Sequence, residues 1–147
     1  MAITATNNRI EVGRGYDVTG VVDEADGVEA GDLVVSDDGE TWGYADSEGQ
    51  EDVLFGIVLG NAVDEEFDDE DVITVRISGL AQVELEDIGC EYGEYVEASS
   101  NDGEVTVAEP FVNTDTSTDQ EVEGLEAIVG RVKTARDDSG TIVIEVM

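Results

Sequence analysis

The stretch "VITVRIS", residues 72 to 78, indicates the fold most directly. Apolar residues occupy every second position, at Ile73, Val75 and Ile77, and the residues between them are polar. Successive side chains of a β-strand point to opposite faces, so this alternation places the apolar residues on one face and the polar ones on the other. The stretch therefore predicts a half-buried strand, and no segment of the chain shows a helical period of similar length.

Runs of the same character recur along the chain between turns rich in Gly, Asp, Asn and Ser. Asp-Gly pairs within "SDDGET" (36–41) and "SSNDGEV" (99–105) predict tight hairpins, because glycine adopts positive φ without steric cost. Short helical turns are compatible with residues 63–70 and 119–127. We expect strands at residues 18–22, 32–36, 53–59, 72–78, 81–85, 94–98, 104–108, 127–133 and 141–146.

Two halves of the chain resemble each other. The segments "AGDLVVSDDGE", "FGIVLGNAV" and "DVITVRISG" are followed, in the same order, by the similar "YGEYVEASSNDGE", "VGRVKTARD" and "GTIVIEVM". We interpret them as a weak internal repeat, with pseudo-repeats at about residues 27–80 and 87–147. A half of three or four strands with one apolar face must pack on its twin. The predicted fold class is therefore all-β, a small β-barrel or a two-sheet β-sandwich.

The chain is strongly acidic. It has 38 acidic and 6 basic residues, a formal charge of −32, while 40% of its residues are apolar, enough for a folded core. A dense carboxylate surface stays hydrated in molar salt, where repulsion is screened over about 3 Å. This composition predicts adaptation to high salt. It also argues against a nucleic-acid partner, because such binding depends on Lys and Arg neutralising phosphates.

The first twenty residues differ from the rest of the chain. Arg9 and Arg14 balance Glu11 and Asp17, so residues 1–20 are neutral and residues 21–147 carry the whole charge of −32. We expect an extended N-terminal arm over 1–20 and a single β-domain over 21–147. The N-terminal sequence has neither the pattern of a signal peptide nor a membrane-spanning length of apolar residues. It predicts synthesis in the cytoplasm and no membrane partner.

The inventory for catalysis is poor. The chain has no His, one Cys (Cys90) and one Lys (Lys133), which removes the commonest metal ligand and general base. We interpret Cys90 as a turn or core residue without a redox role. Lys133 lacks the flanking residues of a lipoyl or biotinyl lysine, and 147 residues with one Trp offer little cleft for a carboxylate-only glycosidase. We expect no enzymatic activity, no cofactor and no metal.

Three local patterns allow two interpretations each. Residues 62–71 hold seven carboxylates but lack the spacing of a calcium loop, which favours a solvated acidic loop. "DDG" (37–39) and "DDSG" (137–140) fit calcium turns, but tight turns need the same residues, and we favour plain turns. Trp42 and Tyr44 fit either a contact patch or core packing equally well.

A cationic cluster stands out against the acidic background. Arg131, Lys133 and Arg136 form the only basic cluster in the sequence outside the arm. A contact between identical polyanions needs cations to offset repulsion. We therefore expect these three residues at a subunit interface.

The order of four segments resembles a known family. "GYDVTGVV" (15–22), "VEAGDLV" (28–34), "VLFGIVLGNA" (53–62) and "ITVRISGLAQV" (73–83) are similar to the strand-and-glycine pattern of capsid cement or head decoration proteins of tailed viruses. The resemblance spans about residues 15–147, and its motifs carry no catalytic signature. The acidity departs from the family pattern and would suit a virus of a salt-loving archaeon.

The resemblance implies a non-enzymatic module that binds the outside of an assembled icosahedral capsid, stabilises it, and is commonly a homotrimer. Its implied partners are the major capsid protein and other copies of itself, and its implied location is the capsid surface of the virion. An extended arm can add a strand to an exposed sheet edge. The arm residues expected to dock on the capsid are Ile3, Thr4, Thr6, Arg9, Ile10, Val12 and Arg14.

Two other functional classes stay open from the sequence. The first is a non-enzymatic β-barrel binding module of a halophilic archaeon, or a tail or adhesion module of its virus. The second is a small hydrolase that uses carboxylates alone, which the residue inventory disfavours.

The net charge generates a prediction about salt. Lowering the salt from molar to about 0.1 M lengthens the Debye length to about 10 Å and restores repulsion among the carboxylates. The melting temperature, followed by circular dichroism, should therefore fall as salt is removed. An unchanged melting temperature across this range would contradict the halophilic interpretation.

Overall fold

The computed structural model describes residues 15–108, 111–113, 121–123 and 127–147, with side chains for all but 111–113 and 121–123. These residues contain no α-helix, and the predicted all-β class is confirmed. Their strands are β1 (Gly15–Val22), β2 (Val28–Glu29), β3 (Leu33–Ser36), β4 (Thr41–Trp42), β5 (Leu54–Leu59), β6 (Glu66–Phe67), β7 (Val72–Leu85), β8 (Tyr95–Ala98), β9 (Glu104–Ala108), β10 (Phe111–Asn113), β11 (Glu121–Glu123), β12 (Ile128–Val132) and β13 (Gly140–Val146).

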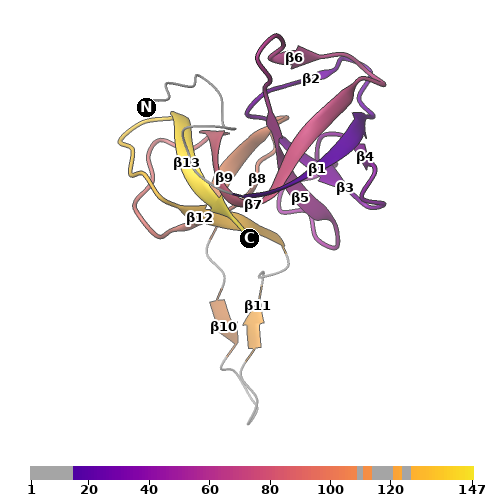
Figure 1. Ribbon diagram of the computed structural model, residues 1–147. Coiled ribbons are helices and arrows are strands. Elements are labelled where there is room, and N and C mark those ends of the chain that lie inside the picture. Colours follow the sequence, from indigo (N-terminus) through magenta and orange to yellow (C-terminus); the bar gives the residue numbers. More distant parts are fainter. Residues whose placement is uncertain (1–14, 109–110, 114–120, 124–126) are drawn as a thin grey trace.

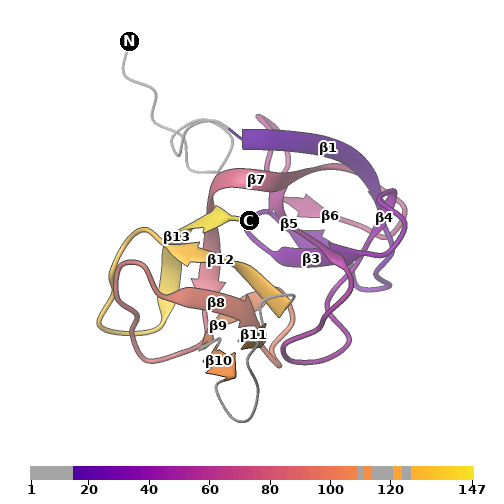
Figure 2. The same ribbon diagram turned by 90° about the horizontal axis from the view of Figure 1, so that it is seen from below.

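Strand β7 runs through both halves of the molecule (Figure 1). It has 14 residues and joins into one strand the two strands predicted at 72–78 and 81–85. Its first part pairs antiparallel with β1 and β5. Its second part pairs antiparallel with β13 and parallel with β9. Each half of the molecule is therefore built around one part of the same strand (Figure 2).

The second half is a closed five-stranded barrel in the cyclic order β7, β13, β12, β8, β9, which we call the second barrel. The first half arranges β7, β1, β4, β3 and β5 in a ring, which we call the first ring. A bridge between Val35 and Gly43 links β3 to the chain after β4 and completes the first ring. Of the two predicted architectures, the structure shows the small barrel.

The two halves share their strand pairings. β3 pairs antiparallel with β5 as β8 does with β12, and β1 pairs parallel with β4 as β7 does with β9. In β3 and β5, Leu33 lies opposite Ile57; in β8 and β12, Tyr95 lies opposite Arg131. The register therefore makes Tyr95 the counterpart of Leu33, and Arg131 the counterpart of Ile57.

Backbone hydrogen bonds before β3 and β8 repeat as well. The amide of Gly31 donates to the carbonyl of Val58 at 2.8 Å, and that of Gly93 donates to the carbonyl of Val132 at 2.9 Å. The amides of Val58 and Val132 donate in return to Asp32 and Glu94, at 3.0 and 2.8 Å. The sequence repeat thus coincides with two copies of one local structure.

Two apolar clusters hold the strands together. Ile73 and Val75 of the opening stretch are buried, as predicted, in the first ring. Trp42 is fully buried in the same cluster, so core packing, and not a contact patch, is its role; Gly20 makes room for it, since a Cβ there would lie 2.3 Å from the indole. The first-ring cluster comprises Val22, Val28, Val34, Trp42, Val58, Phe67, Ile73 and Val75.

Arg76 departs from the predicted pattern. The alternation placed it on the polar face of its strand, but the residue is only 3% exposed. Its Nε and Nη2 donate to the carboxylate of Asp17 at 2.9 and 3.2 Å, and its Nη1 donates to the carbonyl of Leu80 at 2.9 Å. The β1–β7 register shifts here, because Tyr16 faces Ser78 while Asp17 faces Arg76. Arg76 is buried where β7 passes from the first ring to the second barrel.

The two segments compatible with helical turns contain short strands. Within 63–70, β6 pairs with β2; within 119–127, β11 pairs with β10. The β10–β11 hairpin projects away from both halves (Figure 1). Of the predicted arm, residues 15–20 form the first part of β1, and residues 1–14 lie outside the described residues.

The position of Arg76 predicts a large effect on stability. Arg76→Met removes the hydrogen bonds of a buried guanidinium to Asp17 and Leu80 and leaves the Asp17 carboxylate without its cation. We expect a loss of about 2–4 kcal/mol in the free energy of unfolding. Chemical denaturation in molar salt measures it. The matched control is Arg131→Met, where an exposed arginine should cost less than about 1 kcal/mol; equal losses in the two variants would contradict a structural role specific to Arg76.

Candidate functional site

Two of the three predicted interface cations lie together on the outside of the second barrel. Val132 between them is buried, so Arg131 and Lys133 point away from the barrel interior. The guanidinium of Arg131 lies 5.1 Å from the ring centroid of Tyr95, and Nζ of Lys133 lies 5.6 Å from that of Tyr92. Such stacking holds a cation over an aromatic face. We call the surface formed by Tyr95, Arg131 and Lys133 the outer β8–β12 face.

Arg136 is separated from this surface by its own turn. Its Nε lies 2.9 Å from Oδ1 of Asp138 and donates to the carbonyl of Ser139 at 3.0 Å. Its backbone forms a bridge with Cys90, which is 6% exposed. Burial raises the pKa of the Cys90 thiol, which disfavours the reactive thiolate. Arg136 therefore serves the turn of residues 136–141, and the structure does not bring it together with Arg131 and Lys133.

The acidic run is solvent-facing, as the sequence predicted. All seven of its carboxylates, from Asp64 to Asp71, are on exposed residues, whereas Phe67 in their midst is 7% exposed and part of the first-ring cluster. Over the part of the chain that the structure describes, no group of three or more potential ligands is arranged to hold a metal ion. The run is a solvated loop anchored by one aromatic side chain.

The hairpin of residues 36–41 is organised by one carboxylate. Asp38 accepts hydrogen bonds from the amides of Thr41 and Glu40, at 2.8 and 2.7 Å, and from the hydroxyls of Thr41 and Ser36. These bonds, led by the Thr41 amide, hold the pKa of Asp38 well below its usual range. Asp37 and Glu40 remain exposed beside it. The predicted plain turn is therefore held by the hydrogen bonds of Asp38, and two further carboxylates, of Asp37 and Glu40, are exposed.

Sequence reasoning missed a polar contact of the first half, which lies against the β8–β9 hairpin of the second half. The hydroxyl of Tyr44 donates to Asp32 at 2.6 Å, and burial raises the pKa of that carboxyl. A Cβ on Gly103 of the β8–β9 hairpin would lie 2.7 Å from Oδ1 of Asp32. The available signal was the repeat, since Asp32 corresponds to Glu94, and both cap the amide three residues earlier.

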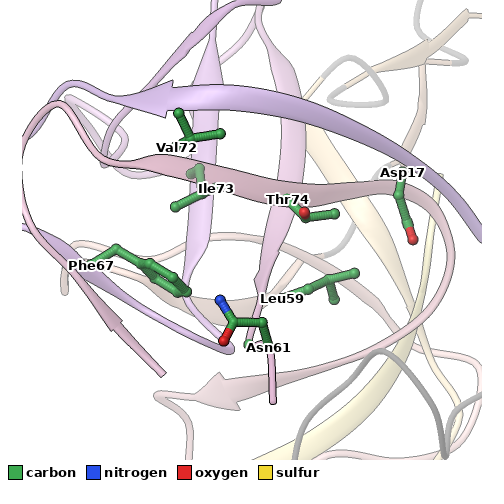
Figure 3. A pocket seen from close by; sticks show the side chains of 8 residues that line it. Asp17, Leu59, Asn61, Phe67, Val72, Ile73 and Thr74 are labelled. Carbon is green, nitrogen blue, oxygen red and sulfur yellow. The ribbon is translucent and has the colours of Figure 1, made fainter. Parts of the chain in front are cut away.

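A small hollow of about 200 Å³ opens on the first ring where β5 ends and β7 continues (Figure 3). Its lining mixes polar and apolar groups, and its one charged side chain, Asp17, is held by Arg76. The lining residues are Asp17, Leu59, Gly60, Asn61, Phe67, Val72, Ile73 and Thr74. No nucleophile–base or paired-carboxylate arrangement is found among them.

The arm residues expected to dock on a capsid, from Ile3 to Arg14, lie outside the described residues. Within the described ranges, no helix is long and apolar enough to cross a membrane.

The shared β7, the closed second barrel and the first ring define a two-ring all-β protein. Among solved structures, the chain is similar to the head fiber gp8.5 N base in bacteriophage phi29, with a TM-score of 0.51 and 14% sequence identity over 90% of this chain and 95% of that chain. At this identity the likeness shows a common fold. No family model matches the chain, and no curated protein matches it.

The hydrogen-bonded carboxylate of Asp38 in the 36–41 hairpin generates a prediction about the pH dependence of stability. Because the folded pKa of Asp38 lies below its ordinary value of 3.8, its ionised form stabilises the fold above that value, and this contribution is lost as the pH falls through the folded pKa. Asp38→Ala should therefore destabilise the protein at pH 7, and its deficit relative to wild type should shrink in acid. Thermal denaturation at several pH values measures the difference.

The matched control is Asp137→Ala, in the exposed turn of the other half. It should change stability little at any pH. A deficit of Asp38→Ala that stays constant into strong acid would contradict the assigned role of the carboxylate.

Proposed function

We propose that this protein is a structural component of a tailed virus, binds the outside of its assembled icosahedral capsid and stabilises it in high salt. The observation that supports this most is the fold likeness to a phage head fiber base, which extends over nearly the full length of both chains. The resemblance of residues 15–147 to head decoration proteins supports the same role from the sequence. In this role the protein is not an enzyme.

Self-association is part of the proposal. Arg131 and Lys133 place two cations on one face of a chain with a net charge of −32, where they would offset repulsion between copies. A homotrimer is the expected assembly. The major capsid protein is the second partner.

The arm is the proposed capsid-docking element. β1 begins at Gly15 and pairs along its length with β7, so the arm leaves the β-domain directly from a sheet strand. Ile3, Thr4, Thr6, Ile10 and Val12 favour an extended conformation that can add to a sheet edge of the shell. Arg9 and Arg14 would face carboxylates of an equally acidic capsid.

The function is tested by two measurements. Mass spectrometry of purified virions should detect the protein in stoichiometric amounts, and the full-length protein should co-sediment in molar salt with capsids that lack it. Decorated capsids should also melt at a higher temperature than bare ones. Absence from virions together with no co-sedimentation would overturn the proposal.

The arm is tested by deleting residues 2–14, which ends one residue before β1 and leaves the sheet complete. Each subunit of an oligomer contributes an arm, so losing all of them should reduce capsid binding steeply. We expect at least a tenfold loss of co-sedimentation, with the circular dichroism spectrum in high salt retained. Binding equal to that of the full-length protein would move the interface to the β-domain.

A pair of point variants distinguishes binding through the backbone of the arm, as in strand addition, from binding through its side chains. Ile10→Pro removes a backbone donor and should weaken binding, whereas Ile10→Ala keeps the donor and should weaken it much less. Equal losses would argue that the side chain, and not the backbone, makes the contact.

A further inference from the structure

The outer side of the β3–β5 pair is covered within the chain. Val34 and Val58 point into the first ring, while Leu33, Val35, Phe55 and Ile57 belong to the apolar cluster of the second barrel. All four residues of β3 are therefore buried, two sides of the strand being covered at once. One half of the molecule accepts the other on this face.

The covering element at the start of β3 is the β8–β9 hairpin. The amide of Leu33 donates to the carbonyl of Gly103 at 2.9 Å. The tip of this hairpin also lies against Asp32, since a Cβ built on Gly103 would lie 2.7 Å from Oδ1 of Asp32. The contact thus consists of a glycine-containing hairpin of the second half placed on β3 of the first half.

As far as the described residues go, the corresponding face of the second barrel is more open. By the shared register, Tyr95, Arg131 and Lys133 stand where Leu33, Ile57 and Leu59 stand in the first ring. Those three first-ring residues are at most 3% exposed, whereas Arg131 is exposed and Tyr95 and Lys133 are half-buried. In the first half, Ala45 and Val53 of the loop after β4 pack against the cluster that contains β3 and β5. In the second half, the described strands β10 and β11 project away (Figure 1).

Within the described residues, the tip of the corresponding hairpin of the first ring, at Gly39, lies in open space. Gly39 has φ of +78° and Gly103 has φ of +79°, so each hairpin has a glycine in the same left-handed conformation. No atom lies within 4 Å of a Cβ built on Gly39. The hairpin exposes Asp37 and Glu40, held outward because Asp38 is engaged in the turn.

We propose that the 36–41 hairpin of one copy docks on the outer β8–β12 face of a second copy, repeating between chains the contact that the β8–β9 hairpin makes inside the chain. Asp37 and Glu40 then meet Arg131 and Lys133, the charge pairing that two polyanions need at a contact. The contact is heterologous, so it closes a ring of subunits when the rotation between copies permits. It rests on the proposed self-association and not on capsid binding.

A cross-linking experiment in molar salt, without capsids, tests the pairing. Chains carrying Glu40→Cys with an affinity tag are mixed with untagged chains carrying Lys133→Cys and treated with a short bis-maleimide. The native Cys90 is buried and contributes little background. We expect a tagged–untagged product in the mixture and at least tenfold less product from either variant alone. Asp64→Cys, an exposed acidic position outside the contact, replaces Glu40→Cys in the matched control and should give no such excess.

Charge reversal gives an independent readout by light scattering. Arg131→Glu with Lys133→Glu should weaken self-association at least tenfold, and adding Asp37→Lys with Glu40→Lys should restore it. A cross-linked product from Lys133→Cys chains alone would mean that two copies meet symmetrically through this face. If the oligomer is intact but the mixture gives no cross-linked product, the copies meet through another surface. Either result overturns the inference. Failure here with retained capsid co-sedimentation would leave the proposed function standing.

Discussion

The ion pair between Arg76 and Asp17 lies at the point on which both halves depend. β7 belongs to both the first ring and the second barrel, each of five strands. It changes partner strands near its middle, where its register with β1 shifts. Arg76 binds Asp17 on β1 and the carbonyl of Leu80, beyond the shift. A Cβ on Gly15 would lie 2.6 Å from Nε of Arg76, so glycine leaves the space that the guanidinium fills. One buried cation thereby ties together the first strand and both parts of the longest one.

The repeat contains equivalent positions that carry side chains of opposite polarity. Ile57 and Arg131 occupy the same place in the shared register, yet one is fully buried and the other exposed. Each lies opposite the equivalent residue of the paired strand, although β12 carries a register shift before Gly130 that β5 lacks. What differs is the neighbour: Ile57 packs in the apolar cluster of the same chain, whereas Arg131 is exposed and lies opposite Glu145. Side-chain chemistry at matched positions therefore records what each face contacts.

The sequence predicted the strands well where alternation and length were sufficient, as at residues 72–78. It divided β7 at Gly79, because a glycine between apolar runs looks like a break, although Gly79 pairs with both Gly15 and Val146. The two-residue strands β2, β4 and β6 exist only through a partner's backbone, which no local pattern encodes. The burial of Arg76 depends on Asp17, 59 residues away. At the candidate site, the sequence grouped three cations, but Arg136 is held by Asp138 and Ser139 of its own turn.

The placement of the cations follows from the cost of charge in this chain. In molar salt, which we propose as the protein's medium, surface carboxylates repel one another only over about 3 Å, so the acidic loops would need no partners. Repulsion returns where water and ions are excluded, inside the fold or between chains. Inside the fold, Arg76 offsets the charge of Asp17 where the two halves meet. Arg131 and Lys133, held over Tyr95 and Tyr92 on the outer β8–β12 face, are positioned to offset charge between chains, because a joint between two acidic chains is where an outward cation lowers the free energy most.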